Sequence, residues 1–154
     1  MPIAYIGIGS NLGDREENCL RAIDRLSREG ITVKKRSSLY ETEPWGLKDQ
    51  PKFINAAVEI ETEREPEELL ETLKKIENDF GKQAPSAKWG PRVIDLDILF
   101  YDDRIIHNTD LEVPHPHLHE RDFVLKPLSE IAPQKIHPLL KKTLAELLTE
   151  LDNE

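Results

Sequence analysis

The sequence is poor in the residues that mark several common classes of protein. Its 154 residues include one cysteine, Cys19, which has no partner in the chain for a disulfide, so nothing indicates an oxidising compartment. No apolar run approaches the ~20 residues that cross a bilayer. The first basic residue, Arg15, comes too late for a secretory signal. We therefore expect a soluble, cytoplasmic protein.

Positive charge is also scarce, and this limits the choice of partners. The chain has 21 Lys and Arg against 30 Asp and Glu, a formal net charge of −9, which disfavours nucleic acids and anionic membranes. No G-x-x-x-x-G-K-[ST] motif occurs, so a P-loop is excluded and side chains with Mg²⁺ must hold any nucleotide phosphate. With no linker, repeat or low-complexity tract, residues 1–154 are expected to form a single domain.

The hydrophobic patterns follow one another in the order strand, helix, strand, strand, helix, strand. The predicted strands are Pro2–Gly9, Val33–Glu41, Phe53–Glu61 and Val93–Tyr101, and the predicted helices are Arg15–Arg28 and Pro66–Gly81. This order is typical of the ferredoxin-like βαββαβ core of α+β domains, with a mainly antiparallel sheet. An extra C-terminal hairpin, with a return strand around Ile105 and Ile106, and helices near Leu144–Leu151 complete the expected fold.

Three residues define the first helix in this prediction. Asp14 has the position and spacing of an N-cap, and Gly30 is placed to end the helix. Cys19 falls on the apolar face, so we interpret it as a core residue rather than a nucleophile.

The feature with the clearest chemistry is a pair of carboxylates in the last predicted strand. Asp95 and Asp97 alternate with Ile94, Leu96, Ile98 and Phe100, so the two acids share the face opposite the expected core. Oxygen ligands about 6.5–7 Å apart along a strand suit Mg²⁺. A plain exposed strand face is the alternative.

A basic connection precedes this strand and favours the metal interpretation. It contains Lys82, Lys88, Trp89 and Arg92, and such a long loop is typical of a lid or binding loop. Cations beside paired carboxylates predict a polyphosphate bridged by Mg²⁺. Downstream, His115 and Arg121 are further candidate phosphate donors.

Three alternating histidines offer a competing metal site. His115, His117 and His119 are separated by single residues in PHPHLH, and a zinc site built on them is an alternative. Strand-like alternation places neighbouring histidines in line rather than around a point. One histidine contacting phosphate is the favoured interpretation.

An aromatic–amide pair indicates a flat ligand. Phe53 and Asn55 lie on the same face of their strand, where the ring can stack on a heterocycle and the amide can bond to its edge. The alternative, which the two residues alone favour, is an ordinary aromatic at a strand start with the asparagine capping a neighbour. The segment Gly7–Gly13 approaches a dinucleotide fingerprint but its third glycine comes one residue late.

Together these segments resemble the 6-hydroxymethyl-7,8-dihydropterin pyrophosphokinase family of folate biosynthesis. The matching segments are Ala4–Gly13, Tyr40–Thr42, Gln50–Val58, Lys88–Leu99, Val113–His115 and Arg121–Leu125. The resemblance implies a ferredoxin-like fold and transfer of pyrophosphate from ATP to the pterin hydroxymethyl group, with release of AMP. It further implies two Mg²⁺ ions, with ATP as co-substrate.

The resemblance also implies a role for each matched residue. Asp95 and Asp97 match the metal ligands, and together with Arg92 and Lys82 they form the expected catalytic set. The expected pterin contacts are Thr42, Glu43, Trp45, Phe53, Asn55 and Phe123. The expected ATP contacts are Lys74, Glu77, Lys88, Trp89, Arg92, Ile98, His115 and Arg121.

Two alternatives and one departure accompany this hypothesis. The alternatives are a non-catalytic ferredoxin-like module that binds a ligand or metal, and the zinc protein described above. Where family members often have several arginines, this chain has Lys82 and Lys88, which present point charges rather than bidentate forks.

The expected partners are ATP and a dihydropterin, with no nucleic acid and no membrane, and the expected assembly is a monomer or weak homodimer.

Overall fold

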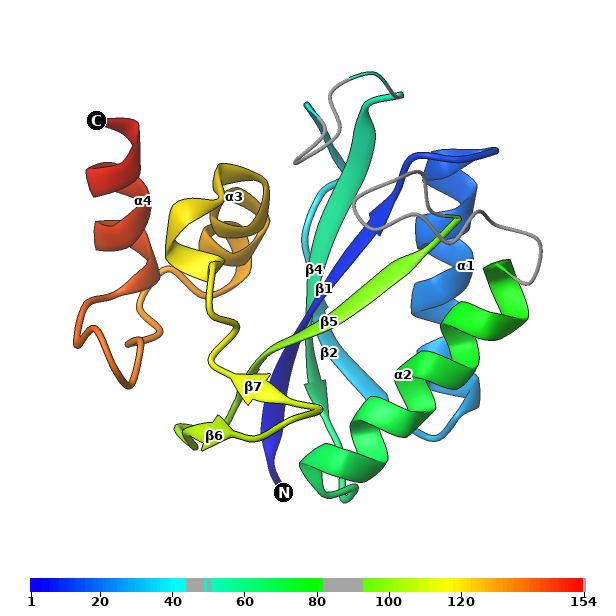
Figure 1. Cartoon of the computed structure of the whole chain (residues 1–154), viewed down its shortest axis with the longest axis horizontal. Helices are drawn as coiled ribbons and strands as arrows, with labels where there is room; N and C mark the ends of the chain where they lie inside the picture. Colours follow the sequence, from blue (N-terminus) through cyan, green and yellow to red (C-terminus); the bar gives the residue numbers. More distant parts are fainter. Residues whose placement is uncertain (44–48, 50, 82–92, 154) are drawn as a thin grey trace.

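The strand and helix patterns fold into an antiparallel sheet with helices on both faces (Figure 1). The computed structural model describes residues 1–43, 49, 51–81 and 93–153. The main sheet contains β1 (Ile3–Ser10), β2 (Thr32–Arg36), β3 (Tyr40–Thr42), β4 (Phe53–Glu61) and β5 (Asp95–Tyr101). Its strand order is β2-β4-β1-β5, with β3 also paired to β4. This order confirms the predicted ferredoxin-like core.

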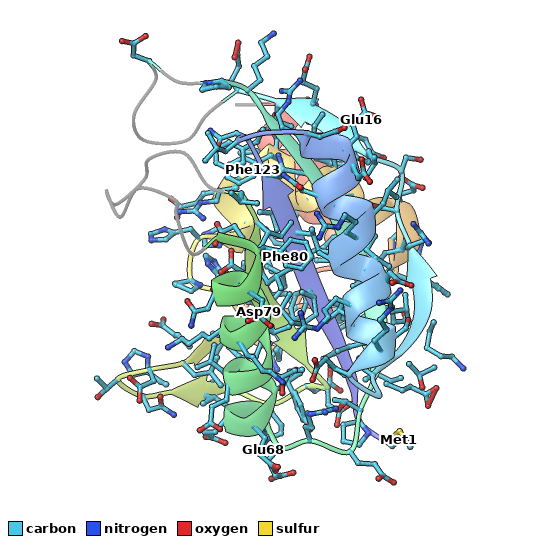
Figure 2. The ribbon with its side chains drawn as sticks, turned by 90° about the vertical axis from the view of Figure 1, so that its right-hand side faces the viewer. Met1, Glu16, Glu68, Asp79, Phe80 and Phe123 are labelled. Carbon is cyan, nitrogen blue, oxygen red and sulfur yellow. The ribbon has the colours of Figure 1, made fainter. Side chains whose placement is uncertain are left out.

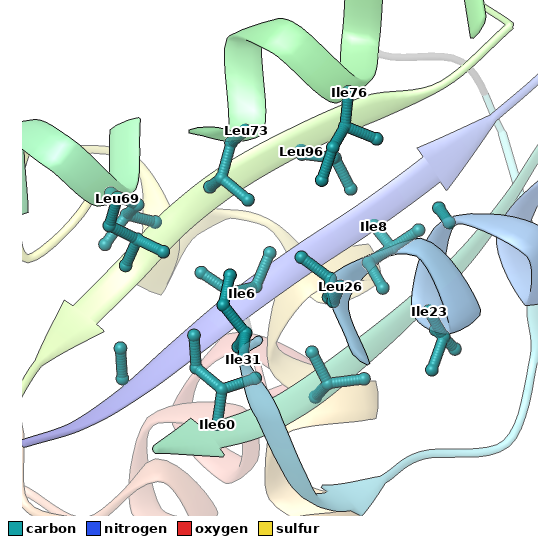
Figure 3. Packing of buried hydrophobic residues seen from close by; sticks show 14 of the residues in the cluster. Ile6, Ile8, Ile23, Leu26, Ile31, Ile60, Leu69, Leu73, Ile76 and Leu96 are labelled. Carbon is teal, nitrogen blue, oxygen red and sulfur yellow. The ribbon is translucent and has the colours of Figure 1, made fainter. Parts of the chain in front are cut away.

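One face of the sheet is covered by α1 (Arg15–Arg28) and α2 (Pro66–Gly81), both at the predicted bounds. Figure 3 shows Leu26 of α1 and Leu73 and Ile76 of α2 packed over Ile6 and Ile8 of β1. Burial of one such side chain contributes about 1.5–3 kcal/mol, so this cluster supplies a large part of the stability. Cys19 is fully buried in the same cluster, which confirms its interpretation as a core residue.

The ends of α1 are set by the two residues that the sequence indicated. The Asp14 carboxylate accepts a hydrogen bond from the Glu17 N–H at 3.2 Å, as an N-cap does. Gly30 follows the helix with φ +86°, the left-handed conformation that glycine adopts without strain.

The second predicted strand is in fact two strands, and the prediction of one continuous strand over Val33–Glu41 was wrong. Arg36 pairs with Val58 and Tyr40 with Asn55, so four steps along this segment match three steps along β4. The extra length is accommodated at Ser37, whose hydroxyl accepts a hydrogen bond from the Ala57 N–H at 2.9 Å. Both segments pair antiparallel with β4, and the interruption separates β3 from β2.

The expected alternation in β5 fails at its C-terminal half. Ile6 pairs with Ile98 and Tyr5 with Phe100, so Leu99 is an extra residue and forms a bulge. Phe100 therefore packs on the opposite face from Ile98, not on the same face as predicted. Both faces of β5 consequently contribute to a hydrophobic core.

The second face is covered by α3 (Asp122–Ile131) and α4 (Leu144–Asp152), on the far side of the sheet from α1 in Figure 1. The sequence placed no helix at α3. Its sixth residue is Pro127, a helix-interior proline that normally argues against a helix. A hairpin of β6 (Ile106–His107) and β7 (Glu112–Val113) and a 3-10 turn at Leu118–Glu120 connect β5 to α3. Helix α4 is confirmed. The predicted hairpin is present, but its strand near Ile106 pairs with β7 in a separate sheet rather than returning along β5.

We predict that Gly30→Ala destabilises the chain by about 1–2 kcal/mol, because a side chain disfavours the left-handed conformation. No atom lies within 4 Å of the position that a Cβ would take, so the cost is conformational rather than steric. Gly30→Asn is the matched control and is expected to cost less, since asparagine tolerates this region. Urea unfolding measures both, and equal stability of the alanine variant and wild type would contradict the assignment.

Candidate active site

The antiparallel register brings the predicted site residues into two rows across the sheet. Gly9 of β1 pairs with Asn55 on one side and with Asp95 on the other. Gly7 pairs in the same way with Ala57 and Asp97. Residues paired across antiparallel strands share a face, and strands lie about 4.8 Å apart. The Asp pair and the Asn55 amide therefore face the same side, roughly 10 Å apart at the backbone.

Glycine in the middle of both rows leaves the floor of a cavity open. A Cβ on Gly9 would lie 2.9 Å from Asn55 Oδ1 and 3.5 Å from the Phe53 ring. A Cβ on Gly7 would lie 3.3 Å from a methyl group of Leu99. The cavity above these glycines has a volume of about 370 Å³. That volume suits a small heterocycle.

One part of the cavity has aromatic and amide walls. Phe53 and Asn55 reach it from β4, Thr42 from β3 and Phe123 from the first turn of α3. The Asn55 amide donates a hydrogen bond to the Thr42 hydroxyl, with 2.5 Å between Nδ2 and Oγ1. Glu43 also lines this part. Figure 2 shows Phe123 towards the end of the molecule opposite Met1 and Glu68.

The other part of the cavity has acidic walls that lie partly out of water. Asp95 and Asp97 both line it, and both are half-buried. Burial and then the charge of Glu77 raise the pKa of Asp97 to about 6, although Arg121 acts in the opposite direction. The negative charge at Asp97 is therefore unfavourable in the protein alone. A cation placed there would relieve it.

The carboxylate pair fits a magnesium ion. Mg²⁺ is commonly held by one or two carboxylates together with substrate phosphates and water, rather than by a complete protein shell. Among residues 1–43, 49, 51–81 and 93–153, no three His, Cys, Asp or Glu side chains are placed to hold a metal. The three-histidine zinc alternative therefore has no support in the geometry, whereas a two-carboxylate magnesium site remains in keeping with it.

Two donors stand beside the acids. Burial, followed by the charges of Arg121 and His117, lowers the pKa of His115 to about 4, so its ring is neutral at pH 7. Its Nδ1 accepts a hydrogen bond from the His117 N–H at 3.3 Å, which leaves the proton on Nε2 for donation. The Arg121 guanidinium lies 5.6 Å from the centre of the Phe123 ring and is attracted by Asp95 and Asp97.

Three predicted nucleotide contacts do not line the cavity. Ile98 is 4% exposed and packs in the core against α1 and α2, and Lys74 is exposed on α2. Glu77 lies beside the Asp pair, where its carboxylate accepts the Leu96 N–H at 2.7 Å. The predictions for Trp45, Lys82, Lys88, Trp89 and Arg92 fall outside the described residues.

The sequence reading missed several residues that shape the cavity. Gly7 and Gly9 match an imperfect fingerprint in the sequence, but two glycines two apart in a strand also signal close approach of a ligand to one face. The Arg15 guanidinium donates to the Lys52 carbonyl at 2.7 Å and to the Glu41 carboxylate at 3.2 Å. It thereby joins the ends of β3 and β4 that hold Thr42 and Phe53.

The fold and the cavity define the class of the protein, a ferredoxin-like α+β domain with a small-molecule pocket on one face of its sheet. The family model described as 7,8-dihydro-6-hydroxymethylpterin-pyrophosphokinase (HPPK) matches residues 5–133. The chain belongs to this family. The resemblance stated from the sequence motifs is thus confirmed.

Relatives extend this match over nearly the whole chain. The 2-amino-4-hydroxy-6-hydroxymethyldihydropteridine pyrophosphokinase of Aquifex aeolicus is 44% identical over 150 residues, which cover 97% of this chain and 92% of that one. The enzyme of the same name from Bacillus subtilis is 50% identical over 133 residues, covering 86% of this chain and 79% of the relative.

Longer relatives contain the same unit as one part. A crystal structure of Plasmodium falciparum HPPK-DHPS superposes with a TM-score of 0.74 at 18% identity and so shows the fold alone. This chain is covered to 97% but spans 43% of that protein. It spans 23% of the folic acid synthesis protein FOL1 of Dictyostelium discoideum, to which it is 44% identical.

We predict that Asp97→Asn stabilises the metal-free protein by about 1–2 kcal/mol at pH 7.5. Because the folded-state pKa of Asp97 is raised to about 6, the aspartate destabilises the fold above pH 6 and this penalty disappears towards pH 4. Urea unfolding in EDTA at pH 7.5 and pH 4 measures the gain. The exposed Asp110→Asn is the control, and a gain that does not fall with pH would contradict the prediction.

Proposed function

We propose that this cavity is where the chain transfers pyrophosphate from ATP to the hydroxymethyl oxygen of 6-hydroxymethyl-7,8-dihydropterin, giving the pterin diphosphate and AMP. Family membership makes the chain an ATP-dependent diphosphotransferase of folate biosynthesis. The relatives give no support to the non-catalytic binding module considered from the sequence.

The observation that supports this assignment most strongly is the row of Asp95, Gly9 and Asn55 across three strands. It places the paired acids and the amide on one face with no side chain between them. A ligand that has a flat ring at one end and a reacting group at the other can therefore span the row. A hydroxymethyl pterin has this shape.

The aromatic part of the cavity binds and orients the pterin in this proposal. Phe53 of β4 and Phe123 of α3 both line this part and offer ring faces for stacking. Asn55 and Thr42 supply polar atoms for the edge of the ring. Fixing the ring fixes the hydroxyl, and an oriented nucleophile removes much of the entropic barrier to a two-substrate reaction.

The acidic part holds the nucleotide phosphates. His115 Nε2 and the Arg121 guanidinium are donors for phosphate oxygens, and the arginine can bind two oxygens at once. Attack by the hydroxyl on the β-phosphorus breaks the bond to the α-phosphate and releases AMP. Positioning and neutralisation of charge suffice for this transfer, so no covalent intermediate on the protein is needed.

Asp95 and Asp97 are the residues that would hold magnesium, for which we propose two ions. Magnesium supplies neutralisation of phosphate charge and a lower pKa for the attacking hydroxyl. The carboxylates would place that charge beside the donors His115 and Arg121. Burial of the pair limits competing water.

Assembly and compartment remain proposals from the sequence. We propose a monomer or weak homodimer in the cytoplasm. Within the described part of the chain, no helix has the length and apolar character needed to cross a membrane.

The direct test combines the protein with ATP, Mg²⁺ and the hydroxymethyl dihydropterin and measures AMP. We expect Mg²⁺-dependent turnover in the wild type and a loss of about three orders of magnitude in Asp97→Ala, because charge stabilisation of this kind is a large part of such catalysis. The exposed Asp110→Ala is the control, with circular dichroism to verify folding. Near-normal turnover of Asp97→Ala would refute the assignment.

A second prediction ranks two cations of the basic connection. Arg92→Ala is expected to slow the single-turnover rate more than Lys82→Ala, because a guanidinium binds phosphate through two parallel bonds and an ammonium acts as a point charge. Arg92→Lys, which keeps the charge, should fall between wild type and Arg92→Ala. The opposite order for the two alanine variants would show that lysine has replaced the family's arginines in function.

A further inference from the structure

The pterin part of the cavity depends on a strand with little support of its own. Thr42 belongs to β3, which has three residues and, within the part of the chain that the structure describes, pairs with β4 alone. Phe123 faces the same space from α3, on a different element. Backbone pairing therefore sets the distance from Thr42 to Phe53 but does not set the distance from Thr42 to Phe123. Because α3 packs on β4, to which β3 is paired, this distance is partly constrained, and a direct bond between β3 and α3 would fix it further.

Glu130, in the last turn of α3, makes that connection. Its carboxylate accepts the Tyr40 hydroxyl at 2.6 Å. The same carboxylate accepts the Ser38 N–H at 3.0 and 3.1 Å and the Ser38 hydroxyl at 3.2 Å. These residues are 90 and 92 positions apart in the chain. One acidic side chain thus joins β3 and its approach to the helix.

Both ends of the connection lie on the faces that form the cavity. Glu130 and Phe123 are seven residues apart on α3, so they share one face of the helix about 10 Å apart. Tyr40 and Thr42 are two residues apart on β3 and share one face of the strand. Tyr40 also pairs directly with Asn55. A shift at Tyr40 would therefore move Thr42 and Asn55 relative to Phe123.

The bonds are charge-assisted, and they lie at the protein surface, where Glu130 and Ser38 are exposed. Hydrogen bonds from Tyr40 and Ser38 lower the pKa of Glu130 below its ordinary value, so it is ionised at neutral pH. The same bond raises the pKa of Tyr40 to about 12, which keeps its hydroxyl protonated as a donor. Bonds between an ionised acceptor and a hydroxyl are shorter and stronger than neutral ones.

We propose that Glu130 is a positioning residue for the pterin: through Tyr40 and Ser38 it holds β3 at the separation from α3 at which the ring fits between Phe53 and Phe123. This role rests on the proposed function. It predicts a specific weakening of pterin binding when the connection is cut. Arg121, His115 and the acids remain in place, so the nucleotide part should be unaffected.

A second tyrosine–glutamate bond in the chain provides a matched control. The Tyr5 hydroxyl donates to Glu59 at 2.6 Å, the same distance as the bond from Tyr40 to Glu130. Tyr5 lies four residues from Gly9 along β1 and does not line the cavity. Tyr5→Phe therefore removes a hydrogen bond of the same kind and length, at a more buried position, and should reduce stability without moving the pterin walls.

The experiment compares Tyr40→Phe, Glu130→Gln and Tyr5→Phe in the full chain. We expect a roughly ten-fold higher KM for the pterin in the first two, with KM for ATP and kcat within two-fold of wild type; ten-fold corresponds to about 1.4 kcal/mol. Tyr5→Phe should lower Tm about as much as Tyr40→Phe does, and it should leave both KM values unchanged. Ser38→Ala, which leaves the carboxylate bonded to Tyr40, provides the comparison if Glu130→Gln does not fold.

The outcomes separate the two levels of the proposal. An unchanged pterin KM in Tyr40→Phe, or an equal rise in Tyr5→Phe, would overturn the positioning role and leave the proposed function standing. A wild-type chain that forms no AMP would instead contradict the proposed function. In that case, weaker binding of the pterin alone to Tyr40→Phe than to wild type, measured by calorimetry, would still support the positioning role, and equal binding would overturn it.

Discussion

The register of β1 between β4 and β5 is the constraint on which the site depends. Antiparallel pairing sets Gly9 between Asn55 and Asp95, and Gly7 between Ala57 and Asp97. A slip of one residue in either pairing would turn one set of side chains to the opposite face of the sheet. The hydrophobic residues that alternate with the glycines prevent such a slip, because Ile6 and Ile8 are buried against α1 and α2. The core thus determines where the polar groups meet.

The negative charge in the site destabilises the folded protein and favours the binding of a cation. Asp97 is half-buried near Glu77, and its raised pKa reports that the ionised form is disfavoured there. Arg121 offsets part of this charge and also lies over the Phe123 ring. It therefore stands between the acidic and aromatic parts of the cavity. A cation bound to polyphosphate would neutralise the charge of Asp97, which is unfavourable in the protein alone. A charge held in such an unfavourable environment is typical of functional sites.

Local patterns in the sequence were enough to predict the core beneath α1 and α2, but not the core on the other face or every feature of the site. The α1 bounds, its Asp14 cap and the facing of Asp95 with Asp97 follow from short-range periodicity, and all agree with the structure. The bulge at Leu99 could not be foreseen, because it depends on pairing with β1 rather than on the strand's own pattern. For α3, an internal proline concealed a helix that tertiary packing stabilises.

The two faces of the sheet are formed by different kinds of contact, and this difference explains where the predictions from the sequence failed. The α1 and α2 face is built from amphipathic helices whose stripes are visible in the sequence. The other face is assembled from β3, α3 and the segments around His115, joined by contacts such as Tyr40 with Glu130 across 90 residues. Side-chain hydrogen bonds of this kind leave no periodic signal. A cavity formed in this way can be adjusted by single substitutions in its supporting bonds while the core beneath it stays unchanged, because the two sets of contacts share few residues.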